Sequence, residues 1–211
     1  MKIDFVSDVS CPWCAIGLNA LEQAIGRLGP DLKVDLHFQP FELNPDMGPG
    51  GQDITEHLVQ KYGITPEQAD SNRDAIRQRG LQVGFGFNME RRGRIYNTFD
   101  AHRLLHWAGL QGQQLELKHA LFAAYFTEGR DPSDRGLLVS LAGQVGLDEA
   151  QARQVLEEDR FAQEVRELEQ FYAGQGIRSV PSVIINDRHL IQGGQPVELF
   201  EQALRQIAAE G

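Results

Sequence analysis

The chain has 211 residues, 41% of them hydrophobic, and a formal net charge of −10 at pH 7. This length allows one domain with a substantial core, or one domain that carries an insertion. The acidic balance argues against nucleic acid or an anionic membrane as the main partner, and the one arginine cluster, at 91–94, is expected to be a solvated turn. We find no apolar run long enough to span a bilayer.

The N-terminal region is predicted to form a strand, a helix and a second strand. The apolar run at 2–6 indicates a short buried strand. A helix should begin after Cys11, with Pro12 at its first position, and end at the Gly-Pro pair 29–30. Residues 33–38 alternate between polar and apolar side chains, as a half-buried strand does. We expect a right-handed parallel crossover between the two strands.

The middle of the chain is predicted to be helical. Residues 40–52 are irregular and rich in Pro and Gly, which is typical of a linker, whereas nearly every segment from 53 to about 174 has a helical pattern. Capping and turn signals place helix starts at several positions. These are Thr65, Asn97 or Thr98, the segment after Asp131-Pro132-Ser133, Asp148, and Phe161.

The C-terminal region returns to strands. Residues 182–185 and 189–191 predict a hairpin, and a closing helix should start at Pro196. Without the middle region, the order is β-α-β followed by α-β-β-α, which is the order of a thioredoxin core. We therefore predict an α/β, thioredoxin-like fold with a large all-helical insertion. The predicted boundaries are 1–45 and 160–211 for the core and 53–159 for the insertion.

The chemistry of the chain is predicted to lie in Cys11-Pro12-Trp13-Cys14, which holds its only two cysteines. Two thiols with this spacing at a strand-to-helix junction can close and reopen a small disulfide ring. Free N–H groups and the helix dipole favour a thiolate at Cys11, which would attack, while Cys14 would resolve the mixed disulfide. A permanent disulfide would stabilise little across so small a loop, and a zinc site would need further ligands.

A second predicted feature is the Val180-Pro181 bond. A proline at the start of a strand is usually a trans residue at a sheet edge, but the upstream cysteines and the downstream hairpin favour a cis bond packed against Cys11. The backbone of Val180 would then pair with an extended substrate. Trp13 is expected to contact substrate as well, with simple packing as the alternative.

Several other residues carry weaker signals. The segment at 84–87, Gly-Phe-Gly-Phe, predicts either a loop over the active site or a helix-end turn with core phenylalanines. Asp8 is either a proton acceptor for the thiols or a carboxylate that caps its loop, and Glu42 has the same two interpretations. His102 and Trp107 share a helix and are expected to be packing residues.

Together these features resemble the DsbA family of thiol-disulfide oxidoreductases. Three further segments resemble its FrnE-like branch, which is largely cytoplasmic; they are Pro-Phe-Glu-Leu at 40–43, Asn-Thr-Phe-Asp-Ala-His-Arg-Leu at 97–104 and Gly-Gly-Gln-Pro at 193–196. That branch is related to 2-hydroxychromene-2-carboxylate isomerases and kappa-class glutathione transferases. Those relatives typically carry Ser where this chain has Cys11, and they use glutathione.

The resemblance implies a redox-active center that exchanges disulfides with peptide or small-molecule thiols. Such exchange requires no metal or dissociable cofactor, although glutathione remains a candidate co-substrate. Without a histidine between the cysteines, the thiolate should be less favoured than in DsbA centres that have one. The rival hypotheses are a glutathione-dependent transferase or isomerase and a thiol-independent, peptide-binding chaperone. Because Met1-Lys2 leads into the first strand without a secretory signal, we expect a cytoplasmic location. No particular oligomeric state is predicted.

Overall fold

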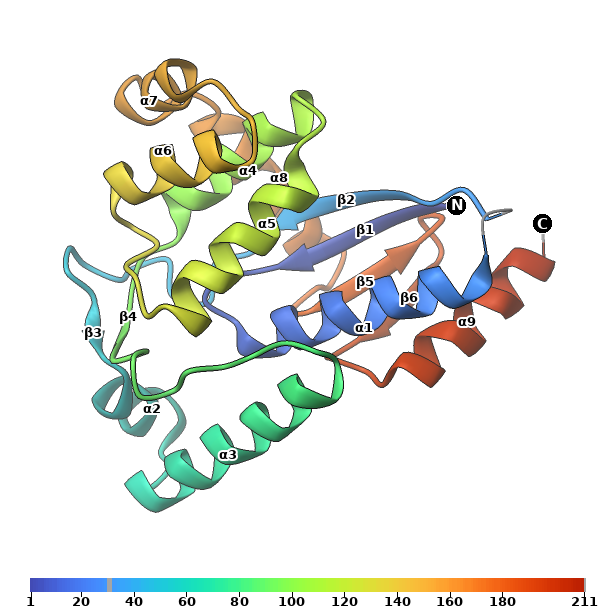
Figure 1. Ribbon diagram of the computed structural model, residues 1–211, viewed down its shortest axis with the longest axis horizontal. Helices are drawn as coiled ribbons and strands as arrows, with labels where there is room; N and C mark the ends of the chain where they lie inside the picture. The colour runs from blue at the N-terminus through green and yellow to red at the C-terminus, as the bar shows by residue number, and fades with distance from the viewer. Residues whose placement is uncertain (30–31, 211) are drawn as a thin grey trace.

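A four-stranded sheet forms the centre of the protein in the computed structural model, which describes residues 1–29 and 32–210 (Figure 1). The strand order is β2-β1-β5-β6, with β1 parallel to β2 and β5 antiparallel to both β1 and β6. The predicted hairpin and the predicted parallel pairing of the first two strands are confirmed. The strands are β1 (Lys2–Ser7), β2 (Asp35–Pro40), β5 (Ser182–Ile185) and β6 (His189–Gln192).

Three helices cover the two faces of this sheet. The helices α1 (Pro12–Leu28) and α9 (Val197–Ala209) lie side by side on one face, where they share a core with β1 and β5 (Figure 1). On the other face, α8 (Ala162–Gly174) contributes Tyr172, which packs with Val6 of β1. Gly29 ends α1 with a positive φ of 83° and a ψ of 175°, which glycine adopts without steric cost; the second half of the predicted Gly-Pro stop lies outside the described residues.

The chain between β2 and β5 is mostly helical, as predicted. Thr65 forms a full capping box with Gln68, and Asp148 accepts a hydrogen bond from the Gln151 N–H, so these two predicted helix starts are confirmed. The helices are α2 (Ile54–Tyr62), α3 (Pro66–Gln82), α4 (Phe99–Leu110), α5 (Gln114–Phe122), α6 (Arg135–Gln144) and α7 (Glu149–Glu157).

Two features of this region were not predicted. The short strands β3 (Gln52–Asp53) and β4 (Arg94–Ile95) pair antiparallel, and a π-helical turn (Ala123–Thr127) continues α5. Two-residue strands are too short to show an alternating pattern in the sequence. The β3–β4 pair closes the loop ahead of α2 and holds the 92–95 segment near the start of α1.

The helical region has its own apolar cluster, but it also shares the core of the sheet. Leu104, Leu138 and Val155 pack together among α4, α6 and α7. By contrast, Phe122 and Phe126 pack in the same cluster as Phe5, Val183 and the apolar face of α1. The division of the chain into a core and an insertion at 45, 53 and 160 stays a prediction.

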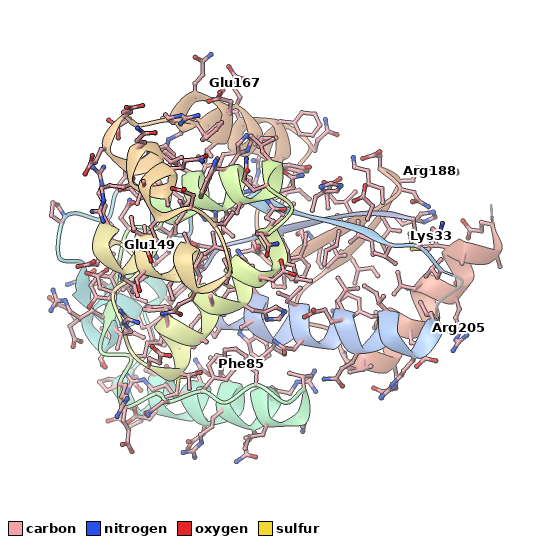
Figure 2. The ribbon with its side chains drawn as sticks, turned by 45° about the horizontal axis from the view of Figure 1, so that its top comes forward. Lys33, Phe85, Glu149, Glu167, Arg188 and Arg205 are labelled. Atoms are coloured by element: carbon pink, nitrogen blue, oxygen red, sulfur yellow. The ribbon has the colours of Figure 1, made fainter. Side chains whose placement is uncertain are left out.

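The Gly-Phe-Gly-Phe segment packs into the core. Phe87 is buried, and the rings of Phe85 and Phe87 meet the ring of Phe126 edge-on, at centroid distances of 6.3 and 5.3 Å. Phe85 lies just above α3 in Figure 2. The segment is therefore a helix-end turn with core phenylalanines, and the alternative of a loop over the active site is wrong.

Candidate active site around Cys11 and Cys14

The two cysteines occupy the first turn of α1. Cys11 is the N-cap residue with extended backbone angles (φ −91°, ψ 112°), and Pro12 takes the first helical position, as predicted. The Cys11 carbonyl accepts a hydrogen bond from the Cys14 N–H at 3.1 Å, which places both side chains on the same turn. Both cysteines are free thiols. Cys11 lines a cavity, whereas Cys14 is fully buried beneath it.

Burial makes Cys14 a weak acid. The removal of its thiol from water, followed by the neighbouring sulfur of Cys11, raises the pKa of Cys14 well above its ordinary value. A thiol in this state is a poor nucleophile until a local change favours its ionisation. The two thiols therefore differ in access and in environment, although they are only two residues apart.

The Val180-Pro181 segment lies against the cysteines. Its peptide bond is cis, as predicted. The thiol of Cys11 donates to the Val180 carbonyl at 3.7 Å, so the predicted substrate-binding backbone is next to the sulfur. Pro181 is buried, and a Cβ added at Gly17 of α1 would lie 3.1 Å from its Cγ. Gly17 thus permits the close approach of α1 to the proline turn.

Trp13 is the exposed member of the tetrapeptide. Its side chain is 38% exposed, and together with Cys11 and Val180 it lines the same cavity. This placement agrees with contact with a substrate, although the contact itself stays a prediction. The structure thus brings Cys11, Trp13, Val180 and Pro181 together, with Cys14 directly below.

Asp8 is a buried carboxylate that holds the loop before Cys11. It accepts hydrogen bonds from the Ser10 N–H at 3.1 Å, the Ser10 hydroxyl at 2.9 Å and the Leu43 N–H at 2.7 Å. Burial would raise the pKa of Asp8, but His102, at 3.5 Å from Nε2 to Oδ1, and these donors outweigh burial and lower it. Asp8 therefore acts as a loop-capping carboxylate.

The other weak candidates have structural roles. His102 and Trp107 are both buried on α4, as expected. Glu42 pairs with Arg166 and accepts a hydrogen bond from the Asn97 amide at 3.4 Å. Arg166 also pairs with Glu169. Burial, followed by the neighbouring Glu169, raises the pKa of Glu42 to about 7. Glu42 joins β2 to α8 and does not line the cavity.

Lys118 of α5 was not found by the sequence reasoning. It is 1% exposed, and its ammonium lies 5.0 Å from the ring centroid of Phe122 and 5.7 Å from that of Phe38. Burial lowers the pKa of Lys118 to about 8, while the nearby Cys14 and Asp8 oppose that shift. A lysine within the buried stripe of a helix is the only sequence signal that could have pointed to it.

A cavity of about 500 Å³ opens in front of Cys11. Its walls come from the start of α1, from α2 and α3, and from the 92–95 segment, and most of its lining side chains are apolar. This volume is in the range of pockets that hold small molecules. In Figure 1, α2 and α3 lie on the side of the molecule where α1 begins.

Arg92 corrects one expectation. The 91–94 cluster was expected to be a solvated turn, but Arg92 is only 7% exposed and lines this cavity. Its Nη2 donates to the Ser10 carbonyl at 3.1 Å, and its guanidinium lies 5.0 Å from the ring centroid of Tyr125 and 4.9 Å from that of Phe126. The aromatic partners are more than 30 residues away in the sequence, so no local pattern could predict this burial.

Within residues 1–29 and 32–210, no group of three or more His, Cys, Asp or Glu side chains is arranged to hold a metal ion. Across the same residues, no helix has the length and hydropathy needed to cross a membrane.

A central sheet in this order, a C-x-x-C pair at the start of α1 and a cis-proline that follows the carbonyl next to the first sulfur together define a thioredoxin-like protein with a dithiol site. The chain belongs to the DSBA-like thioredoxin domain family, which it matches over residues 2–205. This is a family of DsbA-like thiol oxidoreductases.

Three individual proteins illustrate the similarity. The protein YwbO of Bacillus subtilis (strain 168) is 29% identical over 205 residues, which cover 97% of this chain and 96% of YwbO. The crystal structure of a probable DsbA oxidoreductase, SCO1869 from Streptomyces coelicolor, superposes with a TM-score of 0.91 at 33% identity, covering 100% of this chain and 91% of that one. The cytosolic disulfide reductase DsbM from Pseudomonas aeruginosa, solved with GSH, shares the fold at a TM-score of 0.69 and 16% identity, covering 99% and 100% of the two chains.

Proposed function

We propose that the protein is a thiol-disulfide oxidoreductase in which Cys11 attacks and Cys14 resolves. The observation that carries this proposal is the asymmetry of the pair. Cys11 is the N-cap of α1 and lines an open cavity, whereas Cys14 is fully buried one turn behind it. A helix N-terminus stabilises negative charge, so it favours the thiolate that must attack.

The reaction of the reduced protein with a disulfide has two steps. In the first, the Cys11 thiolate attacks one substrate sulfur, the substrate S–S bond breaks, and one half leaves and takes up a proton. In the second, the ionised Cys14 attacks the Cys11 sulfur, and the other half leaves as a thiol. The substrate gains two electrons and two protons, and the protein is left with a Cys11–Cys14 disulfide. The reverse sequence oxidises two thiols.

The neighbouring residues support this chemistry by position. The Val180 carbonyl, which precedes the cis bond to Pro181, contacts the Cys11 thiol, and Trp13 lines the same cavity, so an extended peptide or a small thiol could be oriented over the sulfur. The exchange as proposed needs no metal or dissociable cofactor. The proposed setting is the cytoplasm, where thiols are kept reduced and a solitary C-x-x-C pair is more often catalytic than structural.

Two serine variants test the roles of the cysteines, and each is the control for the other. Cys14→Ser should accumulate a mixed disulfide at Cys11 when mixed with a disulfide substrate, because the resolving thiol is gone. Cys11→Ser should form none and should lose exchange activity. Intact-mass analysis after acid quenching reads both outcomes. Trapping by Cys11→Ser, with none by Cys14→Ser, would reverse the assignment.

A glutathione-dependent transferase or isomerase is the second candidate, and the cavity of about 500 Å³ beside Cys11 is the observation that favours it. In such an enzyme, glutathione would bind without covalent exchange. The Cys11→Ser/Cys14→Ser double variant isolates this binding, which calorimetry can measure. The absence of heat at millimolar glutathione would leave this candidate without support.

A further inference from the structure

The charges on the wall of the cavity differ from those of the rest of the chain. The protein carries a net charge of −10, yet none of the described residues that line the cavity is an aspartate or a glutamate. Three basic side chains do line it, and they are His57, Arg73 and Arg92. A cavity lined by basic side chains and by no acidic ones is suited to an anionic ligand, even in a protein whose net charge is negative.

Two of these three bases are already satisfied. Arg73 pairs with Asp70 at 2.9 Å and donates to the Thr55 hydroxyl at 2.6 Å. His57 contacts the Gln52 side chain at 2.9 Å through Nδ1. Burial, followed by the charges of Lys61 and Arg92, lowers the pKa of His57, so its ring is neutral at pH 7.

Arg92 is the exception. It is more than nine-tenths buried, and no carboxylate in the described part of the chain forms an ion pair with it. Its Nη2 is held by the Ser10 carbonyl, while its Nε is buried without a partner among the described residues. A buried guanidinium without an anion is costly, because burial of an unpaired charge is strongly unfavourable. The rings of Tyr125 and Phe126 compensate part of this cost, and a ligand carboxylate would add charge-assisted hydrogen bonds where the guanidinium lines the cavity.

Arg92 lies close to Cys11. The carbonyl that holds Arg92 belongs to Ser10, the residue immediately before Cys11, and both Arg92 and Cys11 line the one cavity. A molecule in the cavity can therefore reach the Cys11 sulfur with its own sulfur while another part lies against Arg92. The remaining wall is mainly apolar, with side chains such as Ile54, Leu58 and Ile76.

We infer that the cavity binds low-molecular-weight thiols and disulfides that carry a carboxylate, and that Arg92 is the residue that pairs with this carboxylate. The inference rests on the proposed disulfide exchange at Cys11 and names the class of substrate for it. The volume of about 500 Å³ holds a small molecule. The carboxylate fixes the ligand so that its sulfur lies toward Cys11.

A matched pair of disulfides tests this inference. The probes are 3,3′-dithiodipropionic acid, which carries two carboxylates, and its neutral diamide. The reduced protein is mixed with each at low ionic strength, quenched with acid and analysed by intact mass, and dithiothreitol provides the reference ratio of the two rates. The wild-type protein should favour the diacid by at least about tenfold relative to dithiothreitol, and salt should reduce this preference.

Two variants locate the effect. Arg92→Gln should bring the diacid-to-diamide ratio close to the dithiothreitol value. Arg91→Gln removes the same charge from the neighbouring exposed position, which does not line the cavity, and should keep the wild-type ratio. Because each ratio is measured within one protein, it cancels any change in the reactivity of Cys11.

The outcomes separate this inference from the proposed function. If the wild-type protein reacts with both probes at the dithiothreitol ratio, the carboxylate site is refuted while disulfide exchange stands, and this comparison needs no variant. Retention of the preference by Arg92→Gln would also overturn the role of Arg92. If neither disulfide reacts although iodoacetamide alkylates Cys11, the proposed exchange itself fails.

Discussion

Two glycines of α1 offer a direct test of how closely this helix must approach the proline turn. Gly26 is exposed, and a Cβ added there meets no atom of the described structure within 4 Å. A Cβ added at Gly17 would lie 3.1 Å from the Cγ of Pro181 and 3.4 Å from the Cα of Gly194. The same substitution in the same helix should therefore have opposite effects.

The magnitudes follow from helix propensity and packing. Gly26→Ala should raise the free energy of unfolding by about 0.5–1 kcal/mol, because alanine loses less backbone entropy in a helix than glycine does. Gly17→Ala has the same intrinsic gain, but overpacking against Pro181 costs about 1–3 kcal/mol. It should therefore be less stable than Gly26→Ala by about 1–3 kcal/mol, which corresponds to about 2–4 °C in Tm for each kcal/mol.

Urea denaturation of the two reduced proteins measures the difference in stability, and disulfide exchange with a small substrate measures the effect on the site. Gly17→Ala should also slow exchange, because a shifted Pro181 moves the Val180 carbonyl that contacts the Cys11 thiol. Gly26→Ala lies far along the helix and should exchange at the wild-type rate. Equal stabilisation of both variants, with unchanged exchange, would refute the account of how α1 and the proline turn pack.

Three further predictions concern buried charges. Lys118→Met should raise stability at pH 7, because it removes a buried ammonium whose pKa is lowered to about 8. It should also lengthen the lifetime of the Cys11 mixed disulfide at least about tenfold and move the pH profile of the resolving step upward, because the cation near Cys14 is gone. An unchanged lifetime would assign Lys118 a packing role alone. The raised pKa of Glu42 means that, between pH 4.5 and about 7, the folded state holds a proton that the unfolded state releases. The wild-type protein should therefore lose up to about 3 kcal/mol of stability as pH rises through this window. Glu42→Gln should lack this pH dependence in urea titrations, and the same pH dependence in both proteins would contradict the assignment. The lowered pKa of Asp8 means that its carboxylate stabilises the fold at pH values above the ordinary pKa of aspartate and loses this effect as pH falls. Asp8→Asn should therefore cost about 1–3 kcal/mol of stability at pH 7 and less at pH 3. A stability difference that does not change with pH would contradict the lowered pKa.

The parts of the fold that depend on local signals could be predicted from the sequence. The Thr65 capping box and the Asp148 cap mark their helices within a few residues, and the turn signal between the two strands marks the hairpin at 182–191. The Cys-Pro-Trp-Cys spacing and the proline before β5 identified the chemical centre. Each of these signals lies within one short stretch of chain.

The rest depends on contacts between distant segments. Arg92 was expected in a solvated turn because its neighbours in the sequence are basic, but Tyr125 and Phe126, in the π-helical turn that continues α5, bury it. Lys118 is similar, since only the assembled sheet and helices place it near Cys14. Both residues are charged, so patterns of hydrophobicity assign them to the surface. The cavity and its basic wall could therefore be recognised only in the folded protein.

The central claim is that Cys11 and Cys14 form a reversible dithiol–disulfide couple, and a redox titration of the wild-type protein tests it most directly. The protein is equilibrated in thiol-disulfide buffers of graded potential, and the fraction with an internal disulfide is read by alkylation and intact mass. We expect a single two-electron transition between the potentials of thioredoxin and DsbA, about −270 and about −120 mV. A protein that stays reduced across this range, or that oxidises without joining Cys11 to Cys14, would contradict the claim.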